Sequence, residues 1–178
     1  MLDRNRKILF IHVPKTGGYT ISQCLSAAGL RMEFEGSKHS PLSSYKNVDD
    51  YYKFAFVRNP FDMLVSRYFH NLVNRERDKY KNYGSFAKFI KKAKHKPQKK
   101  LLVNEAGELA MNFIGKFELL PEHYDIVCRQ LGIPNKMPEV GILNASEHDA
   151  YQKYYDAESR KIVEDAMAED LEAFHYEF

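Results

Sequence analysis

The sequence predicts an α/β fold, with a single domain over residues 1–178 and a central parallel sheet flanked by helices. Two segments carry this prediction. The apolar run 8–11 leads through a glycine loop into a helix, and the apolar run 51–57 leads into a second helix. A chain of 178 residues is long enough for one substantial core and too short for two comfortable domains. One compact α/β domain is therefore the most economical arrangement.

The stretch 7–20, with the sequence KILFIHVPKTGGYT, supplies a first anion-binding feature. Its strand stops at Pro14, and the helix that follows the glycines has apolar residues at helical spacing and ends near residue 29. That order aims backbone N–H groups and a helix N-terminus at the loop, where phosphate or sulfate binds favourably. Lys15 adds a positive charge, and Thr16 and Thr20 offer hydroxyl donors.

This loop is P-loop-like without matching the nucleotide-binding motif. That motif places Lys after its last glycine and uses the next hydroxyl to hold magnesium. Here Lys15 precedes Gly17 and Gly18, and no convincing Walker-B aspartate ends a second apolar strand. A nucleoside triphosphatase is therefore disfavoured. The alternative to an anion-binding loop is a buried strand followed by an ordinary glycine turn. That interpretation does not explain why Lys15, Thr16 and Thr20 surround the turn.

A second anion-binding feature follows the second strand. Arg58 stands at the carboxyl end of that strand, where ligands gather in open α/β sheets. Asn59 suits a helix N-cap and Pro60 suits the first helical position, so we expect a helix over 60–73. Ser66 lies two turns into this helix, and both Arg58 and Ser66 are expected to reach one anion beside the helix start.

The positions of Gly and Pro and the spacing of apolar residues predict the remaining strands and helices. We expect strands over 101–104 and 109–117 and helices over 121–131 and 156–174. Gly132 closes the first of these helices, and Pro134 and Pro138 mark a loop.

Composition and charge narrow the class of protein. No apolar run approaches the length of a membrane span and no signal peptide is evident, so we expect a soluble, cytoplasmic protein. Cys24 and Cys128 lie among apolar residues, which favours buried free thiols. Residues 1–100 contain 21 Lys and Arg against 8 Asp and Glu, whereas residues 101–178 contain 6 against 16. The first part is therefore expected to face an anion.

Nucleic acid is disfavoured as that anion, because the interleaved aromatic residues and the Arg-rich face of a nucleic-acid reader are not evident. The lysine-rich segment 88–100 is interpreted as a solvated surface. The more specific alternative is that some of its lysines attract an anionic acceptor.

The two motifs together resemble those of the sulfotransferases that use 3′-phosphoadenosine 5′-phosphosulfate (PAPS). Residues 9–20 resemble the phosphosulfate-binding loop of these enzymes, and residues 54–70, FAFVRNPFDMLVSRYFH, resemble their 3′-phosphate motif. The similarity continues through 113–118 and 144–146 to the C-terminal helix, and it looks most like the carbohydrate sulfotransferase branch.

The resemblance implies a sulfotransferase fold, PAPS as donor and 3′-phosphoadenosine 5′-phosphate (PAP) as product. Lys15 would neutralise charge that builds on the bridging oxygen, and Arg58 with Ser66 would bind the 3′-phosphate. Ser146, in a late loop, would be a further donor contact, with a turn or helix cap as the alternative. No metal is required, since the cationic loop does the electrostatic work that magnesium does in phosphoryl transfer. The backbone amides that would hold the 5′-phosphosulfate are those of Thr16, Gly17, Gly18, Tyr19 and Thr20.

The acceptor hydroxyl needs a base, and His39 is the leading candidate. It lies in the loop after the first helix, where related enzymes that transfer sulfate to sugars carry an active-site His. The pKa of imidazole also suits proton abstraction near neutrality. Glu118 is the reserve candidate, although its carboxylate could serve only to orient its neighbours. His12, at the end of the first strand, is expected to be structural.

The sequence thus predicts transfer of the sulfuryl group from PAPS to an acceptor hydroxyl, on a carbohydrate, by in-line displacement. We expect a glycan partner that is either neutral or anionic, and no nucleic-acid partner. Animal relatives of this branch are usually tethered in the Golgi membrane, whereas this chain starts almost directly on its first strand, which favours a bacterial or viral enzyme. The alternatives are a catalytically inactive polyanion-binding or nucleotide-binding module of the same fold and a P-loop kinase.

Overall fold

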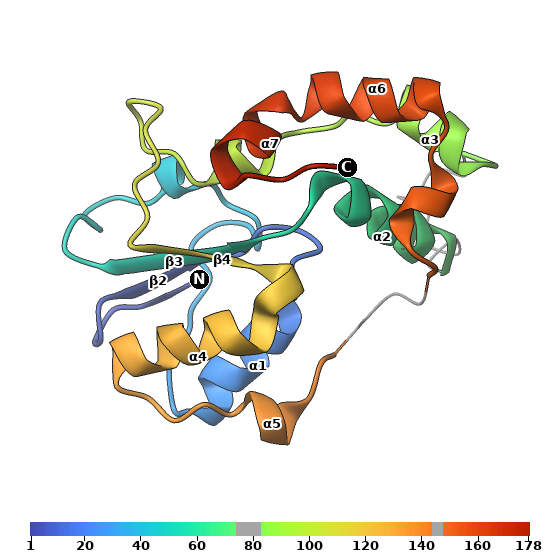
Figure 1. Cartoon of the computed structure of the whole chain (residues 1–178). Helices are drawn as coiled ribbons and strands as arrows, with labels where there is room; N and C mark the ends of the chain where they lie inside the picture. The colour runs from blue at the N-terminus through green and yellow to red at the C-terminus, as the bar shows by residue number, and fades with distance from the viewer. Residues whose placement is uncertain (74–82, 144–147) are drawn as a thin grey trace. The chain divides into compact units, whose positions relative to one another are not determined.

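The computed structural model describes residues 1–73, 83–143 and 148–178 (Figure 1). The chain divides into two compact units. We call Met1–Val57 with Gln98–Ala145 the sheet unit, and Arg58–Pro97 with Ser146–Phe178 the helical unit.

The sheet unit is built on four strands in the order β1-β2-β3-β4. β2, β3 and β4 are parallel, and Ile8 pairs with Tyr52 while Phe54 pairs with Phe113. The predicted central parallel sheet is therefore confirmed, and the two-residue β1 joins its edge in the antiparallel direction. The strands are β1 (Leu2–Asp3), β2 (Ile8–Ile11), β3 (Tyr52–Val57) and β4 (Phe113–Lys116).

Two helices, α1 (Gly18–Ala27) and α4 (Leu120–Leu131), pack against one face of this sheet (Figure 1). Their apolar sides meet alternate strand residues such as Phe10 and Phe54, and together they form the core of the unit. The helix bounds follow their sequence signals, since Gly132 ends α4 with a φ of 62°. Cys24 and Cys128 are buried free thiols, as expected.

Three stretches of the sheet unit differ from expectation. The strand predicted over 109–117 is shorter, because β4 spans only Phe113–Lys116 and Phe117 begins a 3₁₀-helix. Residues 101–104 form no strand, because Leu101 ends the 3₁₀-helix η2 (Gln98–Leu101) and only Val103 makes a bridge, to Leu109. The loop expected around Pro138 contains a short helix, α5 (Met137–Val140). A proline is tolerated in the first turn of a helix, where the N–H group has no intrahelical partner.

In the described residues of the helical unit, four helices pack around aromatic and aliphatic side chains such as Phe61, Phe89 and Met167. The helix predicted over 60–73 is confirmed by α2, whereas the segment 156–174 is interrupted at Met167 and forms two helices. Asp156 and Ser159 make a capping box at the start of the first of these two. The helices are α2 (Pro60–Val73), α3 (Phe86–Lys92), α6 (Ala157–Ala166) and α7 (Ala168–Phe174).

The described part of the chain also contains the short 3₁₀-helices η1 (Leu42–Ser44), η3 (Phe117–Leu119) and η4 (Tyr151–Tyr154). Within the three described ranges of the chain, no helix is both long enough and apolar enough to cross a lipid bilayer.

Candidate active site

The loop between β2 and α1 turns sharply at two residues. Lys15 has a φ of 66° and Gly17 a φ of 74°, both in the left-handed region. This conformation is costly for a residue with a side chain, by about 1 kcal/mol for Lys15. The chain then enters α1 directly at Gly18, with no side-chain cap and no acidic residue in the first turn. The first N–H groups of α1 therefore have no helical partner, and the first turn of the helix places no carboxylate beside them.

Gly18 is needed because a histidine ring occupies the space beside it. A Cβ atom on Gly18 would lie 2.2 Å from both Cδ2 and Nε2 of His12. His12 comes directly after β2, and its ring also stacks on Phe10 with the centroids 5.7 Å apart. The glycine thus lets the end of β2 and the start of α1 approach one another, which fixes the shape of the loop.

The two threonine hydroxyls of the loop have partners within the protein. Thr16 Oγ1 donates to the carbonyl oxygen of Val13 at 2.9 Å. Thr20 Oγ1 accepts from the N–H of Leu143 at 2.9 Å and is 3.4 Å from the Leu143 oxygen. Both residues are fully buried. The expectation that these hydroxyls serve as donors to an anion is therefore not supported, and the backbone N–H groups remain as the candidate ligands.

His39 is held against the same strand end. Its Nδ1 lies 2.9 Å from the carbonyl oxygen of His12, and the two imidazole rings meet edge to face with centroids 4.9 Å apart. A carbonyl oxygen can only accept, so Nδ1 of neutral His39 carries the proton and Nε2 carries the lone pair. The candidate base is thereby fixed in the tautomer that leaves Nε2 basic.

His12 itself is unsuited to proton transfer near neutrality. Burial lowers the pKa of His12 to about 3, and the nearby Lys38 and His39 act in the same direction. Its Nδ1 has no hydrogen-bond partner among the residues that the structure describes. The ring is therefore neutral at working pH, which agrees with the structural role expected for it.

The second anion-binding feature lies at the start of α2, in the helical unit. Asn59 caps this helix as predicted, since its Oδ1 accepts from the N–H of Phe61 at 3.0 Å. Arg58 and Ser66 are both buried. The Arg58 guanidinium contacts Asp62 Oδ2 through Nε at 2.9 Å and through Nη2 at 2.8 Å. Because a guanidinium has five N–H donors, a phosphate could share it with this carboxylate.

Two further candidates remain predictions. Ser146 lies outside the described residues, as do Asn144 and Ala145. Glu118 is exposed and lies in η3, directly after Phe117, whose ring would be 3.3 Å from a Cβ on Gly17. Glu118, the reserve candidate for the base, is thus the chain neighbour of Phe117, which borders the glycine loop.

Sequence reasoning missed one contact and one residue of these sites. His12 was expected to be structural, but its contact with His39 had no sequence signal because it spans 27 residues. Asp62 could have been found, since an acidic residue four positions after Arg58 on a helix is placed to pair with it.

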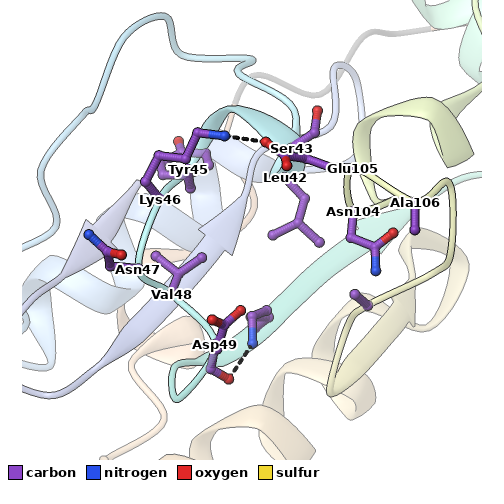
Figure 2. A pocket seen from close by; sticks show the side chains of 12 residues that line it. Leu42, Ser43, Tyr45, Lys46, Asn47, Val48, Asp49, Asn104, Glu105 and Ala106 are labelled. Carbon is purple, nitrogen blue, oxygen red and sulfur yellow. Dashed lines mark hydrogen bonds and ion pairs between the residues drawn. The ribbon is translucent and has the colours of Figure 1, made fainter.

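A separate cavity of about 450 Å³ opens in the sheet unit (Figure 2). Figure 2 shows Lys46 and Glu105 pointing toward one another across its rim, where they form an ion pair. Lys53, the second residue of β3, donates from Nζ to the backbone carbonyl oxygen of Asp49 at 2.9 Å. These groups lie near the amino end of β3, whereas the glycine loop follows the carboxyl end of the parallel strand β2. The cavity is therefore distinct from the loop, and no site residue predicted from the sequence lines it.

A parallel sheet whose first parallel strand feeds a glycine loop and a helix N-terminus belongs to the P-loop-like class of α/β proteins. Within that class, the family model of the sulfotransferase family matches residues 1–177, and the chain belongs to this family of PAPS-dependent enzymes. Membership assigns sulfuryl transfer to a hydroxyl-bearing acceptor as the general reaction. No curated protein matches the chain.

Proposed function

We propose that this protein transfers the sulfuryl group from PAPS to a hydroxyl of a carbohydrate acceptor, with His39 as general base. The hydrogen bond between His39 Nδ1 and the His12 oxygen carries the proposal. It fixes a basic imidazole nitrogen on the strand end that also shapes the glycine loop, which is the arrangement that acceptor activation beside a bound sulfuryl group requires.

The loop of the sheet unit has the features that an anionic donor needs. The N-terminus of α1 offers N–H groups, the first turn has no acidic residue, and Gly18 removes the side chain that would collide with His12. We assign the backbone of Thr16, Gly17, Gly18, Tyr19 and Thr20 to the 5′-phosphosulfate and Lys15 to the bridging oxygen. Arg58 and Ser66 are assigned to the 3′-phosphate, and Ser146 is kept as a further donor contact.

PAPS, when bound, supplies the sulfuryl group. His39 Nε2 takes the proton of the acceptor hydroxyl as the acceptor oxygen bonds to sulfur and the bond from sulfur to the bridging oxygen breaks. Lys15 balances the negative charge that appears on that bridging oxygen. The products are a sulfate ester, PAP and a protonated His39, which returns its proton to water.

The resemblance of residues 9–20 and 54–70 to the carbohydrate branch supports a sugar hydroxyl as acceptor. The alternative is a catalytically inactive binding module of the same fold. Transfer of sulfate from PAPS to any acceptor would exclude that alternative. The single-domain organisation and the cytoplasmic location remain predictions.

The base is tested by His39→Ala. We expect kcat to fall by about a hundredfold or more, because general base catalysis contributes about 10²–10⁴ in rate, while the Kd for PAP stays within about twofold, a difference of less than about 0.5 kcal/mol. The measurements are transfer of labelled sulfate from PAPS to a panel of sugars and calorimetric titration with PAP.

His175→Asn is the control, since His175 is exposed, directly follows α7 and has a φ of 54°, which Asn tolerates. Normal turnover by His39→Ala would end the assignment, and loss of turnover in Glu118→Gln alone would move the role to Glu118.

A further inference from the structure

The carboxylate of Asp62 lies within reach of two basic side chains of the helical unit. Its Oδ2 accepts from Arg58 Nε at 2.9 Å and contacts Nη2 at 2.8 Å. Its other oxygen, Oδ1, lies 3.8 Å from Nε2 of His148. Asp62 is in the first turn of α2, so its position relative to Arg58 is set by the helix. The group that holds the Arg58 guanidinium is therefore also in contact with an imidazole.

His148 is held beside Asp62 by a stacking contact and a hydrogen bond. Its ring stacks on Phe69 of α2, with the centroids 5.9 Å apart and the planes 20° from parallel. Its Nδ1 lies 2.8 Å from the carbonyl oxygen of Asp149. Only 9% of the His148 side chain is exposed. The imidazole is thus packed against the same helix that carries the Asp62 carboxylate.

The hydrogen bond to Asp149 decides which nitrogen of neutral His148 carries the proton. A carbonyl oxygen only accepts, so Nδ1 is the donor and Nε2 holds the lone pair. In this state Nε2 and Asp62 Oδ1 are two acceptors, and their separation of 3.8 Å is too long for a hydrogen bond. A proton on Nε2 turns the same contact into an ion pair. Imidazole side chains change charge between about pH 5 and pH 8.

The groups on the η4 side of His148 are paired with one another. The Asp149 carboxylate lies 3.3 Å from Lys153 Nζ, and the Asp149 N–H donates to the Tyr154 hydroxyl at 3.1 Å. Glu147, the residue before His148, lies outside the described residues.

On the α2 side, His148 faces Asp62 and, beyond it, Arg58. Tyr155 also lies near this carboxylate, and burial, together with the charge of Asp62, raises the pKa of Tyr155, so its hydroxyl stays neutral. With His148 neutral, the charges of Arg58 and Asp62 cancel. A proton on His148 gives these three residues a net positive charge.

We infer that His148 is a positioning residue of the 3′-phosphate site and that its protonation strengthens donor binding. Protonated His148 pairs with Asp62 and competes with Arg58 for that carboxylate, so the guanidinium can give more of its hydrogen bonding to the phosphate. The added positive charge also favours a phosphate dianion. This inference rests on the proposed function, and it adds a dependence of donor affinity on pH that acts through Asp62.

The test is calorimetric titration of the full-length protein with PAP and with AMP, each at pH 6 and at pH 8. AMP lacks the 3′-phosphate. His148→Gln keeps a polar side chain that has no charge at either pH, and His148→Phe keeps a ring that can stack on Phe69. His175→Asn is the control, because His175 is an exposed histidine of the same unit.

We compare the pH ratio, defined as the Kd at pH 8 divided by the Kd at pH 6. For PAP, the wild-type ratio should exceed that of His148→Gln by about fivefold, the upper range for one exposed ion pair. His148→Phe should match His148→Gln, and His175→Asn should match the wild type. The phosphates of PAP and the side chain of His39 also titrate in this range, but they are common to all four proteins and cancel in the comparison. For AMP, the wild type and His148→Gln should give the same ratio.

The inference is overturned if His148→Gln and His148→Phe keep the wild-type ratio for PAP. It is also overturned if they change the ratio equally for PAP and AMP, since the charge would then act on the nucleotide as a whole. In either case, tighter binding of PAP than of AMP by the wild type leaves the proposed function standing. Equal affinity of the wild type for PAP and AMP at both pH values refutes the donor site on which the proposed function and this inference both depend.

Discussion

The imidazole of His12 shows how burial decides what one residue does in this protein. Its ring lies between Phe10, Gly18 and His39, and burial lowers its pKa from an ordinary value near 6.5 to about 3. A neutral ring can support its neighbours without competing with His39 for the acceptor proton. The backbone oxygen of the same residue sets the tautomer of His39. One position thus shapes the loop through its side chain and holds the proposed base, His39, through its main chain.

The depressed pKa of His12 predicts an acid-sensitive component of stability. Unfolding frees the ring to bind a proton with a pKa near 6.5, whereas the folded ring resists protonation down to about pH 3. Between these values the unfolded state holds more protons, so the free energy of unfolding falls as the pH falls. His12→Asn removes this component. The free energy of unfolding of His12→Asn should therefore decrease by about 3 kcal/mol less than that of the wild type between pH 6.5 and pH 4.

Urea unfolding followed by circular dichroism at several pH values measures this difference. His175→Asn serves as control, because His175 is exposed with a φ of 54°, which Asn tolerates. Parallel stability curves for the wild type and His12→Asn would contradict the assigned protonation state.

At the scale of elements, α1 is the helix on which the candidate site depends. It starts with glycine, packs Ile21 and Leu25 into the sheet core, and is tied to a distant segment through Thr20. The Thr20 hydroxyl accepts from the N–H of Leu143, so the chain near residue 143 is fixed to the first turn of α1.

Thr20→Val tests this connection, since valine keeps the shape of the side chain and removes the hydroxyl. The N–H of Leu143 loses its acceptor, and we expect the free energy of unfolding to fall by about 1–2 kcal/mol. Thermal and urea unfolding measure the change, and Thr20→Ser should restore most of it. A Thr20→Val protein as stable as the wild type would show that this hydrogen bond does not hold the two segments together.

The elements that sequence reasoning placed well are those with marked ends. Pro60 and Asn59 mark the start of α2, and Gly132 marks the end of α4. The break between α6 and α7 had no such signal, because Met167 is a buried apolar residue that continues the helical spacing. The two residues of β1 were too few to give any pattern, since a strand is recognised by alternation over four or more residues.

For the candidate site, the order and type of residues in the sequence predicted the glycine loop and the Arg58 segment. They did not predict which groups of the protein these residues contact. The hydroxyls of Thr16 and Thr20 bind the protein's own backbone, which a count of donors could not foresee. The contact between His39 and His12 depends on how a long loop returns to the sheet. Such contacts arise from tertiary packing, and local spacing does not encode them.

At the scale of the whole molecule, positive charge is concentrated in the first hundred residues, where 21 Lys and Arg face 8 Asp and Glu. A donor that carries a phosphosulfate and a 3′-phosphate is strongly anionic, and a basic surface raises its rate of encounter. Both anion-binding features fall within this part of the sequence. We therefore propose that two sets of residues recognise the donor, namely Lys15 with its loop and Arg58 with Ser66.

This division predicts different kinetic defects. Lys15→Ala should lower kcat by about 10²-fold, because its charge is used as the bridging bond breaks. Arg58→Ala should raise the KM for PAPS by about tenfold, the effect of one charge-assisted hydrogen bond. Because Arg58→Ala also leaves the Asp62 carboxylate without its guanidinium, Arg58→Lys is the matched variant that keeps the charge and loses the fork. Equal effects of both changes on kcat and KM would contradict the division.

The most direct test of the central claim is calorimetric titration of the wild-type protein with PAP, AMP and ATP. PAP and AMP differ only in the 3′-phosphate that we assign to Arg58 and Ser66. We predict that PAP binds about 10–100-fold more tightly than AMP, as expected for one or two charge-assisted hydrogen bonds, and also more tightly than ATP. Equal affinity for PAP and AMP, or a preference for ATP, would contradict the account.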